Sequence, residues 1–125
     1  MEATLSEAPF RVSDRPTEAE LLGKYFRVLA EPTRLRILEA LREAGELSVG
    51  ELVKHLGIPQ PSVSNHLTCL RWCGFVVTRR NHRTVYNRIA DPKVTEMMAP
   101  ARSLLSDNAD TSPPAGGPDR GGFPA

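Results

Sequence analysis

The stretch that decides the fold is SVGELVKHLGIPQPSVSNHLTCLRWCGFVVTRRNHRTVYNR, residues 48–88. Ser48 and Glu51 have the spacing of a capping box, which predicts the start of a short helix that ends at Gly57. After a three-residue link, Pro61 opens a second helix, which ends at Gly74. Apolar residues recur along this helix at i, i+4 and i+7, so one face is buried and the other is polar; they are Val63, Leu67 and Leu70.

The residues that follow favour a two-stranded ribbon. β-Branched and aromatic residues at 75–78 and 84–87 are typical of strands, and the basic residues 79–83 join them. We expect a longer or distorted loop there, because Asn81-His82 lacks the glycine that a tight hairpin turn favours. Two short helices, a tight turn and a ribbon together predict a winged helix-turn-helix. In that fold one helix enters the DNA major groove and the hairpin reaches the neighbouring backbone.

Further helices flank this unit. A capping box at Thr17 opens one helix, another runs from Pro32 to Gly45, and Asp91 precedes a last one. Pro100 lies inside the last helix, where it should produce a kink or a break. The expected fold class is mainly α (α+β), with the elements in the order ααα-α-ββ-α.

Length and composition limit the class of protein. With 125 residues the chain has room for one ordinary domain, and its 40% hydrophobic and 25% charged residues are typical of a globular protein. We expect a disordered arm over 1–15, a folded domain over 16–106 and a disordered Pro/Gly-rich tail over 107–125. No apolar run approaches the roughly 20 residues of a membrane span, and the N-terminus lacks the apolar segment of a secretory signal. These features predict a cytoplasmic protein that contacts no membrane.

The charges are unevenly distributed. Residues 52–90 contain six Lys or Arg and all three histidines but no Asp or Glu. A segment of one sign is typical of a face that binds a polyanion, although an ordinary solvated basic hairpin would have the same composition. The chain has no paired-carboxylate, Ser-His-Asp or Gly-rich phosphate motif, so we expect it not to be an enzyme.

Polar residues on and beside the second helix are the predicted DNA contacts. A helical wheel with the apolar face inward places Ser64, Thr68 and Trp72 outward, and short polar side chains there can bond base edges and phosphates. The helix start favours phosphate through its backbone N–H groups. Alternatively, these side chains only cap and solvate the helix. The predicted set is Gln60, Ser62, Ser64, Asn65, His66, Thr68, Arg71 and the hairpin residues Arg79, Arg80 and Arg83.

Four stretches, AEPTRLRIL (30–38), SVSNHLTCLR (62–71), GFVV (74–77) and RTVY (83–86), resemble the ArsR/SmtB family of metal-sensing bacterial repressors. The resemblance implies a homodimeric winged-helix repressor that binds an inverted-repeat DNA operator and releases it when an inducer binds. It also implies that the first and last helices form the dimer interface, with 61–73 as recognition helix and 75–89 as wing. The apolar residues expected in that interface are Leu22, Phe26, Val94, Met97, Met98, Leu104 and Leu105.

Cys69 and Cys73 are the candidate metal ligands. They stand at i and i+4 of the recognition helix, so both thiols project from one side, with His66 on the same edge as a third candidate ligand. Thiolates select soft metals. The pair resembles the cadmium/lead-sensing branch of the family, in which a third thiolate comes from the C-terminal tail of the other subunit. This chain departs from that branch, because residues 74–125 contain no cysteine.

The inducer is therefore expected to be a thiophilic metal or metalloid species, but which one stays open. The resemblance favours Cd or Pb, two thiolates alone would suit two-coordinate Hg(II) or an organoarsenical, and Zn also fits. His66, Asp107 or Asp110 would complete a Cd or Zn shell. The thiol of Cys73 should not ionise easily, because a helix C-terminus disfavours an anion. Other interpretations are cysteines that only fill the core, a regulator that answers redox state or another ligand, and a winged helix used only for protein contacts.

Overall fold

The computed structural model describes residues 15–108 and divides the chain into two compact units, one ending at Thr95 and the other beginning at Glu96. Most of the expected arm over 1–15 and tail over 107–125 lies outside the described residues, so the domain limits drawn from the sequence stay predictions. No helix within the described range is long and apolar enough to cross a membrane.

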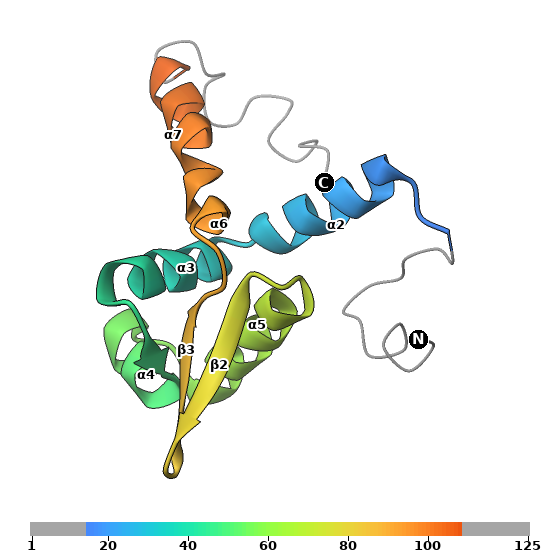
Figure 1. The fold of residues 1–125 in the computed structure, drawn as a ribbon. Helices are drawn as coiled ribbons and strands as arrows, with labels where there is room; N and C mark the ends of the chain where they lie inside the picture. The colour runs from blue at the N-terminus through green and yellow to red at the C-terminus, as the bar shows by residue number, and fades with distance from the viewer. Residues whose placement is uncertain (1–14, 109–125) are drawn as a thin grey trace. The chain divides into compact units, whose positions relative to one another are not determined.

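The first unit contains helices around a small sheet, and Figure 1 shows their arrangement. Its elements are α2 (Glu18–Leu29), α3 (Pro32–Ala44), β1 (Leu47–Ser48), α4 (Val49–Leu56), α5 (Gln60–Trp72), β2 (Val76–Asn81) and β3 (Thr84–Ile89). The short helix α6 (Lys93–Glu96) follows at the boundary between the units, and α7 (Met98–Asp107) lies in the second unit. This order confirms the predicted winged helix-turn-helix.

Local capping explains where the helices begin and end. At α4, Ser48 accepts a hydrogen bond from the Glu51 N–H at 3.1 Å, and the Glu51 carboxylate accepts one from the Ser48 N–H at 2.8 Å. The predicted box at Thr17 forms in the same way. Gly57 ends α4 with a φ of 73°, a left-handed conformation that glycine adopts without strain. These caps satisfy backbone groups that would otherwise have no partner at the helix ends.

The sheet has three antiparallel strands in the order β1-β3-β2. The short strand β1 was not predicted, because two residues cannot show an alternating pattern. The expectation of a longer hairpin loop was wrong: β2 extends to Asn81 and β3 begins at Thr84, so only His82 and Arg83 form the turn. His82 takes a φ of 60°, which is the positive value that such a tight turn needs. Figure 1 shows the hairpin tip beyond the ends of α4 and α5.

The core of the first unit lies between α3, α4, α5 and the sheet. The predicted face of α5 is fully buried, with Val63, Leu67 and Leu70 each 0% exposed. In α2, by contrast, the only buried residue is Val28. Burial of such side chains from several elements holds the helix-turn-helix against the wing. Other core residues are Ile37, Leu38, Leu41, Leu52, Phe75 and Val76.

The expected last helix is two helices that are separated at Met97. Pro100 is the third residue of α7, within its first turn. A proline there costs no intrahelical hydrogen bond, because the first N–H groups of a helix have no partner in the helix. The kink or break predicted at Pro100 is therefore observed as a break before it, between α6 and α7.

Candidate nucleic-acid interface and thiol pair

The polar face of α5 is exposed beside the wing. Asn65, Thr68 and Arg71 are exposed, whereas Ser62 and Ser64 are half-buried. The helix begins after Pro59 without a side-chain cap, but the Ser62 N–H already donates to the Pro59 carbonyl at 3.1 Å. The helix start therefore offers fewer free N–H groups to a phosphate than its sequence implies.

Hydrogen bonds order this face into a row. Gln60 Nε2 donates to Ser64 Oγ at 2.9 Å, and Thr68 Oγ1 donates to the Ser64 carbonyl at 3.0 Å. Arg71 Nη2 in turn lies 3.3 Å from Thr68 Oγ1, to which it donates. Each side chain keeps further donor or acceptor capacity, so the row can present hydrogen-bonding groups in fixed positions.

His66 turns toward α3 instead of joining this row. Its Nε2 lies 3.8 Å from Glu31 Oε1, and its side chain is 21% exposed. Glu31 is the N-cap of α3, where its carboxylate accepts hydrogen bonds from the N–H groups of Thr33 at 2.7 Å and Arg34 at 3.3 Å. The structure thus gives His66 an acidic neighbour that the sequence did not indicate.

The two cysteines are free thiols at the end of α5. Cys69 is half-buried, and Cys73 is 7% exposed and forms the C-cap. Burial, helped by the neighbouring Cys69, raises the pKa of the Cys73 thiol to about 11, although the positive charges of Lys24 and Arg34 oppose the shift. Cys73 was expected to resist ionisation, and it does, with burial as the main cause.

The third metal ligand expected from the sequence is not assembled within the described part of the chain. No group of three or more His, Cys, Asp or Glu residues there is placed to hold a metal ion. His66 therefore does not complete a set with the two cysteines, and Asp110 lies outside the described residues. What the structure brings together is a pair of thiols on one helix.

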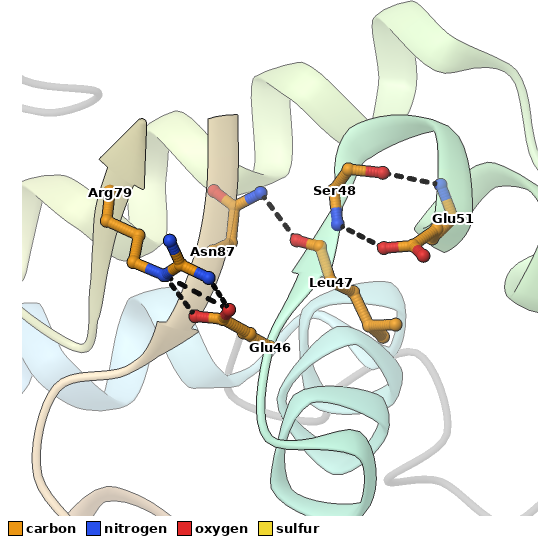
Figure 2. Close-up of polar contacts among 6 residues, drawn as sticks. All are labelled: Glu46, Leu47, Ser48, Glu51, Arg79 and Asn87. Atoms are coloured by element: carbon orange, nitrogen blue, oxygen red, sulfur yellow. Dashed lines mark hydrogen bonds and ion pairs between the residues drawn. The ribbon is translucent and has the colours of Figure 1, made fainter. Parts of the chain in front are cut away.

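The wing arginines differ from one another. Arg79 Nε donates to both carboxylate oxygens of Glu46 at 3.1 and 3.0 Å, and Arg79 Nη2 also pairs with Glu46 Oε1 (Figure 2). The side chains of Arg80 and Arg83 are exposed and form no hydrogen bond or ion pair with any described residue. Arg79, one of the three DNA contacts predicted on the wing, is thus paired with an acid of the same chain. Glu46 was missed because it precedes the acid-free segment and is 33 residues from Arg79 in sequence.

The apolar residues expected in a dimer interface differ in exposure: most are exposed, and two are buried. Phe26 and Leu22 on α2 are 62% and 47% exposed. In the second unit Leu104, Leu105 and Met97 are 62%, 73% and 38% exposed. Val94 and Met98 are only 5% and 9% exposed, so they have little surface left for a partner.

Comparisons with known proteins agree with this architecture. The family model described as "Bacterial regulatory protein, arsR family" matches residues 31–78. The chain is 42% identical over 93 residues, 74% of each protein, to the "Probable mercury resistance operon repressor" of Streptomyces lividans.

Solved structures show the same fold. The crystal structure of Rv0081 from Mycobacterium tuberculosis has a TM-score of 0.70 and 35% identity, and the match covers 78% of this chain and 97% of that one. A solution structure of the homodimeric winged helix-turn-helix DNA-binding domain Mb0332 from Mycobacterium bovis has a TM-score of 0.64 and 28% identity, covering 77% and 88%. The chain therefore belongs to the arsR family of bacterial regulatory proteins and is a DNA-binding transcriptional regulator rather than an enzyme.

Proposed function

We propose that the protein is a homodimeric repressor that binds an inverted-repeat operator and releases it when a soft metal ion binds Cys69 and Cys73. The observation that carries this proposal is the position of the thiol pair, which lies on the same helix as the row of polar groups that we expect to face DNA. A ligand bound at the thiols therefore acts on the element that reads the DNA.

DNA binding is supported by the chemistry of α5 and the wing. Asn65, Thr68 and Arg71 supply exposed hydrogen-bonding groups for base edges or phosphates. Arg80 and Arg83 supply positive charge on the wing that no described residue pairs, and this charge is available for the DNA backbone. With α5 as the recognition helix, this division of roles matches a winged helix-turn-helix on duplex DNA.

A two-fold dimer is supported by apolar surface on α2 and α7. One winged helix makes few base contacts, and a dimer places two recognition helices about one DNA turn apart, roughly 34 Å. Phe26 and Leu22 offer exposed apolar area on α2, and Leu104 and Leu105 offer it on α7. The relative Mb0332 is described as homodimeric.

A soft metal is supported by the donor set. Two thiols on one side of a helix suit a thiophilic ion, and hard ions such as Mg²⁺ or Ca²⁺ prefer oxygen ligands. One relative bears the name of a mercury resistance operon repressor. Hg(II) would need only the two thiols, whereas Cd or Pb would recruit a third donor from another subunit or from residues beyond 108.

The experiment has two stages. Ultraviolet titration of the reduced protein with Cd, Pb, Hg and Zn should produce thiolate–metal charge-transfer bands for the ion that binds. Fluorescence anisotropy of a labelled duplex, selected from a random pool by the protein itself, should then fall when that ion is added. Differential binding of this kind typically changes DNA affinity by about 5- to 150-fold. Operator binding that is unaffected by all four ions would contradict the metal response.

The burial of Cys73 favours one second candidate. A thiol that is 7% exposed with a raised pKa is also typical of a small core residue. In that case the protein is a DNA-binding regulator without a metal response, and the titration above would show no charge-transfer band.

A further inference from the structure

Arg79 lies across the outer face of the wing instead of pointing away from it. Arg79 and Tyr86 are cross-strand partners in the β2–β3 register, and the guanidinium carbon lies 5.1 Å from the centre of the tyrosine ring. Cross-strand partners share one face of a sheet, so the arginine extends along that face over the ring. Beyond the ring its guanidinium reaches Glu46, just ahead of β1.

Contacts on two sides hold the guanidinium in place. The carboxylate of Glu46 accepts its hydrogen bonds in a forked arrangement, and the ring of Tyr86 supports it as a cation–π partner. The hydrogen bond from Arg79 also lowers the pKa of Glu46, so this carboxylate is ionised at neutral pH. Arg79 and Glu46 thus form a neutral pair, whereas Arg80 and Arg83 keep their charge available.

The same segment is bound to the second wing strand. Asn87 of β3 is 1% exposed, and its Nδ2 donates to the Leu47 carbonyl at 3.1 Å. Leu47 belongs to β1, directly after Glu46, and β1 leads without a linker into α4, the first helix of the helix-turn-helix. Figure 2 shows both contacts beside the cap of α4.

From this arrangement we propose that Glu46 and Arg79 form a positioning pair, which fixes the wing against the start of α4, and that Arg79 does not contact the DNA backbone. The proposal rests on DNA binding by α5 and the wing. Each protomer would then bring two wing arginines to the phosphates, Arg80 and Arg83, and Arg79 would act through the placement of these two.

The salt dependence of DNA binding distinguishes a positioning residue from a residue that neutralises a phosphate. The slope of log K against log salt falls by about 0.9 for each phosphate that the protein no longer neutralises, and thus by about 1.8 when both protomers of a dimer change. The Arg80→Gln variant is the matched control and should show this decrease. The neutral double variant Glu46→Gln/Arg79→Gln should bind the duplex more weakly but keep the parent slope, because Arg80 and Arg83 still neutralise their phosphates. A slope that falls in the double variant as it does in Arg80→Gln would overturn the proposal.

Charge reversal tests the pairing itself. Arg79→Glu places two acids side by side and should weaken DNA binding at fixed salt, and adding Glu46→Arg should restore most of the affinity. Failure of the second substitution to restore affinity, with both variants folded by circular dichroism, would also overturn the proposal. All titrations use the full chain and a fluorescein-labelled duplex of about three helical turns that the parent protein selects from a random pool. If the parent protein itself binds no duplex in a salt-dependent manner, the proposed DNA binding is wrong. That result differs from a failure of the Glu46–Arg79 proposal, in which the parent binds and only the variants depart from expectation.

Discussion

Lys24 of α2 lies over the indole ring of Trp72 at the end of α5, with Nζ 4.0 Å from the ring centre. Close by, the rings of Tyr25 and Phe75 meet edge to face with centroids 5.0 Å apart. Helix α2 thereby contacts the same end of α5 that carries Cys73. The charge of Lys24 also reaches the Cys73 thiol and opposes the rise of its pKa. A structural change at the thiols would therefore act on residues in contact with α2, a helix with exposed apolar residues.

Removing the cation above Trp72 should be visible in fluorescence, because the chain has a single tryptophan. Lys24→Met keeps most of the side-chain length but not the charge, so the emission of Trp72 should shift. The free energy of unfolding should fall by about 0.5–1 kcal/mol, the usual strength of an exposed cation–π contact. Lys54→Met, on the exposed surface of α4, is the control and should leave the emission unchanged. Identical spectra for both variants would refute the contact.

Serine in place of either cysteine should separate DNA binding from release. Cys69→Ser and Cys73→Ser nearly preserve side-chain shape, so each variant should still bind the selected duplex. Each should lose the release caused by the metal, because a hydroxyl is a poor ligand for a soft ion. Anisotropy titrations with and without metal measure both properties. Release that matches the parent in both variants would mean that the inducer binds elsewhere.

Metal binding at Cys73 should depend on pH. The thiol keeps its proton up to a pKa of about 11, so a metal that binds the thiolate must displace that proton. The apparent metal affinity should therefore rise about tenfold per pH unit for each proton released, which a pH-indicator assay can count. Lys24→Met should lower the metal affinity at a given pH and leave its pH dependence unchanged, because it removes a charge that lowers the pKa of the thiol. A metal affinity that is independent of pH would exclude Cys73 as a ligand.

The same pKa shift has a consequence for folding stability. The folded thiol titrates at about 11, above its ordinary value of 9.0. Its contribution to stability is therefore fully present below about pH 9 and is lost as the pH rises through 11. Denaturant titrations of the parent and of Cys73→Ser should accordingly converge or cross over this alkaline range, and parallel stabilities there would contradict the shift.

A charge at Phe26 should disrupt dimerisation. Phe26 is 62% exposed, the largest exposed fraction among the large apolar residues of α2. Phe26→Asp should convert the dimer to a monomer at micromolar concentration and weaken operator binding, because burying an unpaired carboxylate in an interface is costly. Val77→Asp, at an exposed apolar position on β2, is the control for surface charge. Light scattering measures both, and an unchanged mass for Phe26→Asp would place the interface elsewhere.

Local signals in the sequence predicted most of the fold. The capping boxes at Thr17 and Ser48 and the glycine after α4 act within one turn, so they can be recognised from neighbouring residues. The buried face of α5 follows from its spacing. The turn at His82 was misjudged because a histidine there accepts a positive φ that residue statistics assign to glycine.

Contacts between distant segments could not be predicted in this way. The pairing of Glu46 with Arg79 depends on β1, a strand of only two residues, and on its position beside β3. The acid-free segment therefore has an acid beside it in space. Likewise, the two cysteines were correctly placed on one helix, but the burial of Cys73 depends on packing that the helical wheel does not include.

Three consecutive residues ahead of α4 each contact a different element: Glu46 contacts β2, Leu47 contacts β3, and Ser48 caps α4. A local opening that releases one of these contacts strains the other two, because no flexible linker separates them. The wing and the first helix of the helix-turn-helix should therefore exchange their amide hydrogens as one cooperative unit. The wing, which we propose contacts DNA, would then unfold together with α4 rather than on its own.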